Sequence, residues 1–148
     1  GAHLAALMAA AGPRAKLEGA NGARGSSEVQ AAIVIAGPTE TDGERAGEQS
    51  RKPDSNYRLF LGGTIDEVRP IYTRASPAHW VSKETPPMLI IGEHSINSAQ
   101  VILSKLNKLK IPNETLVLKG GIHGEWNWTP WFSITMNRVE RFLNQHLK

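Results

Sequence analysis

Two short apolar runs constrain the fold of this chain more than any other feature. Val29–Ile35 is rich in β-branched residues, and Met88–Ile91 is apolar throughout. Neither run alternates apolar with polar residues, which is typical of strands that are covered on both faces in a parallel sheet. Thr115–Leu118 has the composition of a third short strand. The sequence therefore predicts a mostly parallel sheet of about three strands.

Helical patterns lie between and around these runs. His3–Ala11 places Leu4, Leu7 and Met8 on one stripe, which predicts a buried helix. A second helix is expected after Ser98 as its cap, with an inner face of Ile102, Leu106 and Leu109. Alternating strands and helices predict an α/β protein in which helices flank the sheet.

The final helix is expected to begin with Thr129 as cap and Pro130 in the first turn. Its predicted inner face consists of four residues, Val139, Phe142, Leu143 and Leu147. By contrast, residues 39–56 are polar and have no helical period, which predicts a surface insertion or loop. A short helical turn is expected directly after it, at Tyr57–Leu61.

Composition limits the class of protein. At 148 residues the chain fits one domain, and 40% hydrophobic and 21% charged residues are typical of a soluble globular protein. The 17 basic residues exceed the 14 acids only slightly and are scattered, so a nucleic-acid partner is not predicted. No apolar run is long enough to span a bilayer, and no membrane contact is expected. Without cysteine, the sequence leaves the compartment open.

The first twelve residues are apolar like the core of a secretory signal, but they lack the basic flank and the initiating Met of one. The run opens in alanine and leucine with no cap before it. We therefore interpret it as the interior of a helix that begins before Gly1.

Several segments resemble the α/β-hydrolases in the order that this family has them. GAHLAAL at Gly1 resembles the helix after the G-x-S-x-G nucleophile elbow, and IAGPTE at Ile35 resembles the end of the sixth strand. Further matches are FLGG at Phe60, ASPAHWV at Ala75, PPMLIIG at Pro86, IHG at Ile122 and RFLNQHLK at Arg141. The chain is most similar to feruloyl and acetyl-xylan esterase-like (BD-FAE-like) enzymes, and also to the catalytic domain of prolyl oligopeptidases.

This resemblance implies one partial α/β-hydrolase domain over residues 1–148, beginning just after the nucleophile elbow. Gly1 would be the last glycine of the elbow, so the nucleophilic serine would lie two residues before it, and no serine within the chain stands in a G-x-S-x-G pattern. The resemblance assigns His123 as the general base, which accepts the serine proton. No metal and no cofactor are implied.

The acid of the triad does not match the family pattern. Ser95 stands where the family usually has aspartate, and a hydroxyl cannot compensate the charge of an imidazolium. Glu93 is one candidate for a substitute acid. Glu40 and Asp42, which follow the preceding strand, are two others.

Two interpretations of the function follow. The first is a serine hydrolase of acyl or carbohydrate esters, of which this chain is the C-terminal portion and inactive by itself. The second is a non-catalytic relative that kept the fold as a binding or interaction module; the serine at position 95 favours it. A peptidase is a weaker third, because nothing here resembles a propeller or a peptide-terminus site.

Aromatic residues follow His123 closely. Trp126 and Trp128 are candidates for the wall of an acyl or sugar pocket, and the alternative is that these rings seat the final helix on the sheet. The spacing of the histidines and glutamates matches no known metal site.

The strand at 29–35 also predicts an interaction. In the complete fold this strand pairs with the one that leads into the elbow. Alone it would be an apolar edge with unpaired backbone groups, so we expect self-association or docking of the missing N-terminal half.

Overall fold

The computed structural model describes residues 1–17, 26–120 and 122–147. Its centre is a parallel sheet in the order β1-β2-β3, formed by Ala32–Ile35, Met88–Ile91 and Asn113–Leu116. In the register, Val34 lies opposite Ile90, which lies opposite Thr115. The predicted α/β class with a three-stranded parallel sheet is therefore confirmed.

The central strand β2 contributes side chains to the apolar clusters on both faces of the sheet. All four of its side chains are fully buried, and they alternate between two apolar clusters. Met88 and Ile90 belong to the cluster on one face, and Leu89 and Ile91 to the cluster on the other. Each such side chain contributes about 2 kcal/mol of hydrophobic stabilisation.

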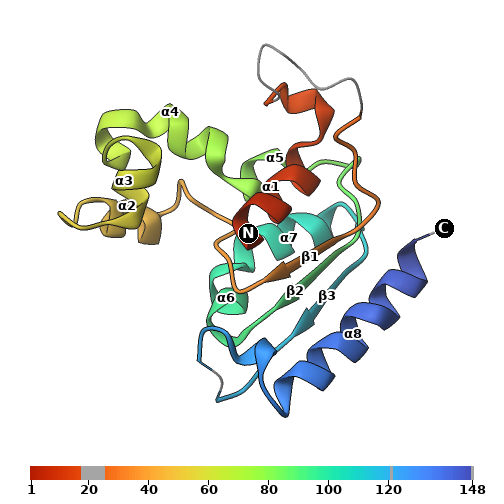
Figure 1. Ribbon diagram of the computed structural model, residues 1–148. Helices are drawn as coiled ribbons and strands as arrows, with labels where there is room; N and C mark the ends of the chain where they lie inside the picture. The colour runs from red at the N-terminus through yellow and green to blue at the C-terminus, as the bar shows by residue number, and fades with distance from the viewer. Residues whose placement is uncertain (18–25, 121, 148) are drawn as a thin grey trace.

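Three helices cover the first face: α1 (Ala2–Ala11), α5 (Pro77–Trp80) and α7 (Gln100–Lys108) (Figure 1). On α7 the predicted inner residues Ile102 and Leu106 are fully buried. On α1, however, the buried residues are alanines, whose small side chains allow the helix to lie close to β1. Leu4 and Met8, expected to be inside, are 54% and 52% exposed.

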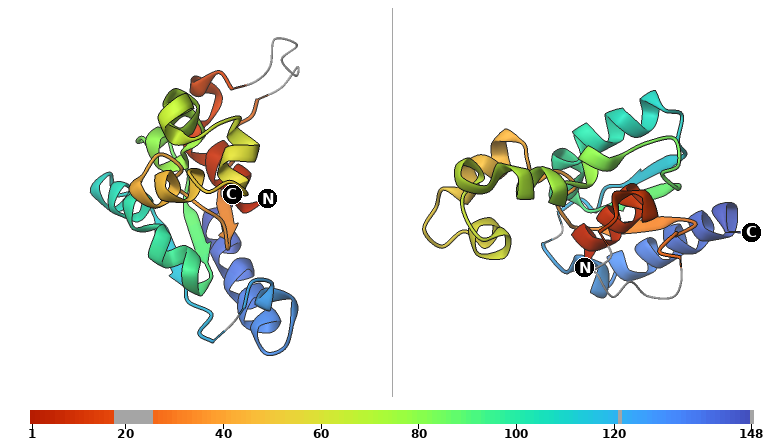
Figure 2. Two further views of the ribbon diagram at one scale, coloured as in Figure 1. Left: turned by 90° about the vertical axis from the view of Figure 1, so that its left-hand side faces the viewer. Right: turned by 90° about the horizontal axis from the view of Figure 1, so that it is seen from above.

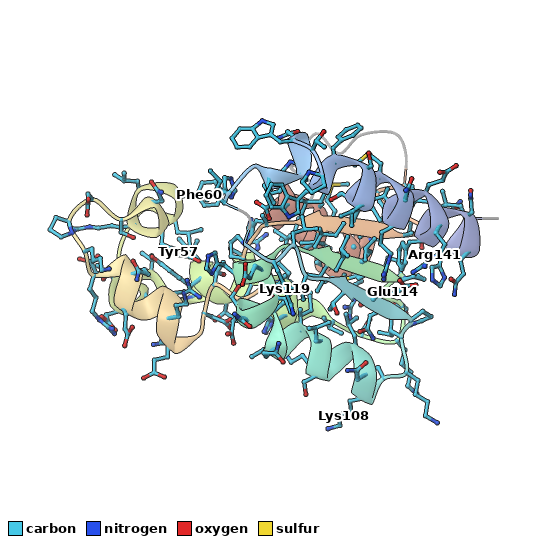
Figure 3. The ribbon with its side chains drawn as sticks, turned by 90° about the horizontal axis from the view of Figure 1, so that it is seen from below. Tyr57, Phe60, Lys108, Glu114, Lys119 and Arg141 are labelled. Carbon is cyan, nitrogen blue, oxygen red and sulfur yellow. The ribbon has the colours of Figure 1, made fainter. Side chains whose placement is uncertain are left out.

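One helix, α8 (Trp131–His146), covers the second face. Its inner side presents Trp131, Val139 and Phe142 to the sheet, as the sequence predicted for the last two. Arg138 and Arg141, on a neighbouring side of the helix, both contact Glu114 of β3, at 3.0 and 3.3 Å. Figure 3 labels Glu114 and Arg141 of this group. These ion pairs fix which flank of α8 faces the β3 edge of the sheet.

Between β1 and α5 the chain leaves the sheet and forms a separate helical unit (Figures 1 and 2). We call it the helical insert; it consists of α2 (Glu44–Ser50), α3 (Asn56–Leu61) and α4 (Ile65–Ala75). Its own small core is formed by Leu61, Ile65 and Tyr72.

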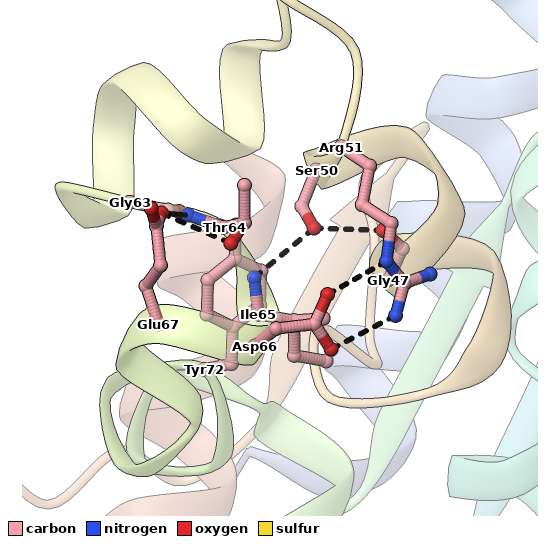
Figure 4. Close-up of polar contacts among 9 residues, drawn as sticks. All are labelled: Gly47, Ser50, Arg51, Gly63, Thr64, Ile65, Asp66, Glu67 and Tyr72. Carbon is pink, nitrogen blue, oxygen red and sulfur yellow. Dashed lines mark hydrogen bonds and ion pairs between the residues drawn. The ribbon is translucent and has the colours of Figure 1, made fainter.

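Polar contacts join α2 to α4 and join α4 to the turn that follows α3 (Figure 4). The Ser50 hydroxyl donates to the Gly47 carbonyl at 2.7 Å and accepts from the Ile65 amide at 3.1 Å, which ties α2 to the start of α4. The Tyr72 hydroxyl donates to the carbonyl of Gly63 at 2.9 Å. On the surface, Arg51 and Asp66 form a bidentate ion pair.

The first turn of α1 contacts two distant parts of the chain. A Cβ atom placed on Gly37, just after β1, would lie only 2.5 Å from the Ala2 Cβ, so this close approach requires glycine. The His3 ring donates from Nε2 to the carbonyl of Ala75 at the end of α4, at 2.7 Å. The start of α1 therefore joins the exit of β1 to the end of the insert.

Several element boundaries differ from the predictions. β1 begins at Ala32 rather than at residue 29, and β3 precedes its predicted position by two residues. Ser98 ends the short helix α6 (Glu93–Ser98) instead of capping α7, and α8 has Pro130 rather than Thr129 at its cap. The 39–56 segment contains the helix α2, which its sequence pattern did not predict. Two 3₁₀ turns, η1 and η2, complete the elements, at Pro13–Ala15 and Glu125–Asn127.

Candidate functional site

A cleft of about 550 Å³ lies at the carboxyl ends of the strands. The segments that follow each strand contribute to its wall: Gly37 and Glu40 after β1, residues 92–98 after β2, and His123 with Glu125 after β3. In open parallel sheets, ligands bind beyond the carboxyl ends of the strands. The insert closes one side of the cleft with Ala46 and three polar residues, Arg45, Gln49 and Tyr57.

His123 lies in the wall of this cleft. Its imidazole is exposed and stands edge-on to the Trp126 ring, with the two ring centroids 5.2 Å apart. Gly124, the next residue, has a positive φ of 103°, a conformation that glycine adopts without strain. The structure therefore places the residue that the resemblance assigned as the base where a ligand in the cleft could reach it.

Ser95 is buried in the first turn of α6. Its hydroxyl donates to the Ile91 carbonyl at 2.9 Å and so satisfies the end of β2. Gly92 makes this tight turn with a φ of 122°, and a Cβ there would lie 2.6 Å from the Ser95 hydroxyl oxygen. The chain thus passes directly from β2 into α6, and the Ser95 hydroxyl satisfies a backbone carbonyl at this turn.

Glu93 connects two parts of the cleft wall. Its carboxylate accepts a hydrogen bond from the amide of Gly120 at 2.9 Å. Gly120 precedes the segment that carries His123, so Glu93 anchors the base of that segment to the start of α6. A charge-assisted hydrogen bond of this kind is stronger than one between neutral groups.

The two carboxylates after β1 are placed differently from each other. Glu40 lines the cleft, whereas Asp42 is not among its lining residues. Burial raises the pKa of the Glu40 carboxyl above its usual value, the charge of Asp42 adds to the shift, and Lys105 opposes it. Glu40 thus lines the cleft with a carboxyl pKa above its usual value.

Glu125 is a cleft residue that sequence reasoning did not assign. It is only 4% exposed, at the start of η2, and it lines the cleft two residues after His123. A buried glutamate in a short 3₁₀ turn leaves no periodic signal in the sequence. Among the described residues, no group of three or more His, Asp or Glu is arranged to hold a metal ion.

The aromatic residues after His123 divide into two pairs. Trp126 and Trp131 pack against the apolar cluster under α8. Trp128 and Phe132 are 56% and 50% exposed, and none of the four is among the residues that line the cleft. Trp126 reaches the site through its contact with the His123 ring.

Comparisons with known proteins agree with this architecture. The acetyl ester-xyloside bifunctional hydrolase of Caldicellulosiruptor lactoaceticus is similar with a TM-score of 0.72 and 20% identity, over 97% of this chain and 53% of that chain. The propionate-bound esterase Est2 of Thermogutta terrifontis is similar with a TM-score of 0.71 and 22% identity, over 98% and 52%. This chain therefore spans about half the length of these structures.

A more distant similarity has a TM-score of 0.57 and 16% identity, to dipeptidyl peptidase 4 of Porphyromonas gingivalis, over 78% of this chain and 16% of that chain. No curated protein matches the chain at a significant level. Among the described residues, no helix has the length and apolarity to cross a membrane. The sequence profile of the BD-FAE family matches residues 1–110, and the chain belongs to that family.

Proposed function

We propose that this chain is the histidine-bearing part of a serine esterase, which hydrolyses acyl or carbohydrate esters once a nucleophilic serine joins it. The observation that carries the proposal is the convergence of two features on one cleft. His123 lines the cleft after β3, and the first turn of α1 touches Gly37, which lines it after β1. A serine shortly before Gly1 would then stand on the same side of the sheet as His123.

The chemistry follows from these positions. His123 takes the proton from the serine hydroxyl as the serine oxygen attacks the ester carbonyl. The protonated imidazole then donates that proton to the departing alcohol, and an acyl-serine remains. Water attacks the acyl-serine with His123 again as base, which releases the acid and restores the serine.

A carboxylate is needed to support the imidazolium, and the turn at Ser95 offers only a hydroxyl that is bonded to Ile91. We propose Glu93 as the substitute, because it already anchors the segment that leads to His123. The polar residues of the insert, Arg45, Gln49 and Tyr57, would contact the alcohol part of the ester. Hydroxyl-rich alcohols such as sugars suit this wall, since each group can exchange hydrogen bonds with a hydroxyl.

A second candidate is a non-catalytic member of the family that binds a partner or ligand in the same cleft. The buried hydroxyl of Ser95 favours it, because a serine bonded to the Ile91 carbonyl cannot supply the negative charge that supports an imidazolium. The two candidates differ in what must precede Gly1. The first requires a G-x-S-x sequence there, and the coding sequence upstream of Gly1 is the direct place to read it.

The decisive experiment is fluorophosphonate labelling with hydrolysis of a short-chain aryl ester. We expect the chain alone to be unlabelled and inactive, and a longer chain that includes an upstream G-x-S-x to be labelled and active. His123→Ala should abolish turnover in that longer chain, while His79→Ala, at an exposed position that does not line the cleft, serves as the control. Labelling of the 148-residue chain alone would overturn the assignment of the nucleophile; an inactive longer chain that contains the serine would support the second candidate.

A further inference from the structure

The insert side of the cleft carries one cationic side chain. Among the described residues that line the cleft, Arg45 of α2 is the only lysine or arginine, and it is exposed. Gln49 also lines the cleft and follows Arg45 at i+4, so the two side chains leave the same face of the helix. The insert therefore presents a guanidinium and an amide side by side to a ligand in the cleft.

Tyr57 of α3 completes this side of the cleft (Figure 3). Its ring stacks on that of Tyr72, with centroids 6.5 Å apart, and packs against the core of the insert. Burial raises the pKa of the Tyr57 hydroxyl, and the positive charge of Arg45 opposes this shift. The phenol therefore keeps its proton at neutral pH and can donate a hydrogen bond.

The donors of these three side chains are not used within the protein. In the described ranges of the chain, the Arg45 guanidinium, the Gln49 amide and the Tyr57 hydroxyl have no hydrogen bond or ion pair. The next arginine, Arg51, is by contrast paired with Asp66. A carboxylate fits such a group of donors, because it only accepts hydrogen bonds and its two oxygens match the fork of a guanidinium.

Three carboxylates line the rest of the cleft, and each is held against the protein. Glu93 accepts a hydrogen bond from a backbone amide, and Glu125 is only 4% exposed. Glu40 lies over Gly43, where an added Cβ would be 2.6 Å from its carboxyl carbon. None of the three forms an ion pair with Arg45. Contact with Arg45 at hydrogen-bond distance outweighs repulsion from these more distant charges, which water and salt screen.

We propose that the cleft selects esters whose alcohol part carries a carboxylate, with Arg45 and Tyr57 binding that carboxylate while the ester carbonyl lies at His123. A uronic acid, which is a sugar that bears a carboxylate, has this chemistry. The Gln49 amide then binds a neighbouring hydroxyl of the sugar. The inference rests on the proposed function, because that function places the alcohol part of the ester against the insert.

Binding of two matched sugars to the 148-residue chain tests this recognition without a catalytic step. Methyl β-D-glucuronide carries a carboxylate where methyl β-D-glucopyranoside carries a hydroxymethyl group. In NMR titrations we expect the glucuronide to bind about tenfold more tightly. Added salt should reduce this ratio of affinities, because it screens the charges.

Variants of the insert assign the preference to its residues. Arg45→Gln should bring the ratio close to one, and Arg45→Lys, which keeps the charge but loses the fork, should retain part of it. Tyr57→Phe keeps the stacked ring and should reduce the ratio by a smaller factor. The charge-matched control is Arg58→Gln, at an exposed arginine of the same insert that does not line the cleft.

Three outcomes would overturn the proposal: equal affinity for the two sugars, no binding of the glucuronide, or an equal loss of preference in Arg58→Gln. Far-UV circular dichroism confirms that each variant is folded.

The longer chain with the upstream serine gives a second measurement. With acetyl esters of the two glycosides as substrates, the ratio of their kcat/KM values should follow the ratio of affinities. An inactive longer chain that still prefers the glucuronide would contradict the esterase function and support the carboxylate site. An active longer chain with no preference between the two esters would contradict the carboxylate site alone.

Discussion

The sheet layer and the helical insert stabilise themselves by different means. The sheet layer buries large aliphatic side chains on both faces of β2, and its contacts are mainly apolar. The insert has three fully or largely buried apolar residues, and its helices are joined by hydrogen bonds to hydroxyls and carboxylates. Apolar packing does not depend on pH, whereas the polar contacts of the insert include groups that titrate. Both regions line the same cleft, so apolar packing holds one wall and hydrogen bonds hold the other.

The largest expected effect is on the sheet layer. Phe142 is fully buried between α8 and the sheet, so Phe142→Ala leaves a cavity that the backbone cannot fill. We expect a loss of about 3–5 kcal/mol in the free energy of unfolding. Urea denaturation measures it, with Phe132→Ala on the exposed flank as the control. A loss below about 1 kcal/mol would mean that α8 is not essential to this core.

A smaller effect is expected in the insert. Ser50→Ala removes the hydroxyl that connects Gly47 with Ile65 and leaves the Ile65 amide buried without a partner. The expected cost is about 1–3 kcal/mol. Hydrogen exchange should localise it to α2 and α4 and leave β2 unchanged, with the exposed Ser104→Ala as control. Equal exchange changes in β2 would show that the insert and the sheet unfold as one unit.

The smallest effect is the response of the insert to acid. A hydrogen bond from Arg51 lowers the pKa of Asp66, and the Thr64 amide lowers the pKa of Glu67. Because these pKa values are lower in the folded state, their contribution is full above the ordinary carboxyl range and is lost as the pH falls through the folded-state values. Carboxyl NMR titration should place both below ordinary values, and amide exchange in α4 should rise at acid pH before that in β2. If amide exchange in α4 and in β2 increased at the same pH, the insert and the sheet layer would not differ in their response to acid.

The difference between the sheet layer and the insert also explains which elements could be predicted from the sequence. β2 was predicted with correct bounds, because an uninterrupted apolar run between Pro87 and Gly92 has few other interpretations. Val29–Ala31 continues the run of β1 with only Gln30 as a polar residue, but the ladder begins only at Ala32, so composition could not set the start of β1. α4 was missed because Pro70 lies inside it and Val68 has non-helical angles, although the T-x-x-E spacing of Thr64 and Glu67 was a readable start signal.

The candidate site was predicted in part. His123 was assigned from its motif, and it lies in the cleft wall. Arg45, Gln49 and Tyr57 were not assigned, since they reach the cleft only through the fold of an insert that is remote in sequence. The outward position of Leu4 and Met8 was also not predicted, because a stripe of large apolar residues outweighs a stripe of alanines in any periodicity argument.

The first turn of α1 connects two parts of the molecule that are distant in sequence. It touches Gly37 at the exit of β1 and holds the carbonyl of Ala75 through His3. The contact with Gly37 lies where the sheet layer lines the cleft, and the contact with Ala75 lies at the end of the insert. A substitution in the first turn of α1 should therefore disturb both the exit of β1, which lines the cleft, and the end of the insert.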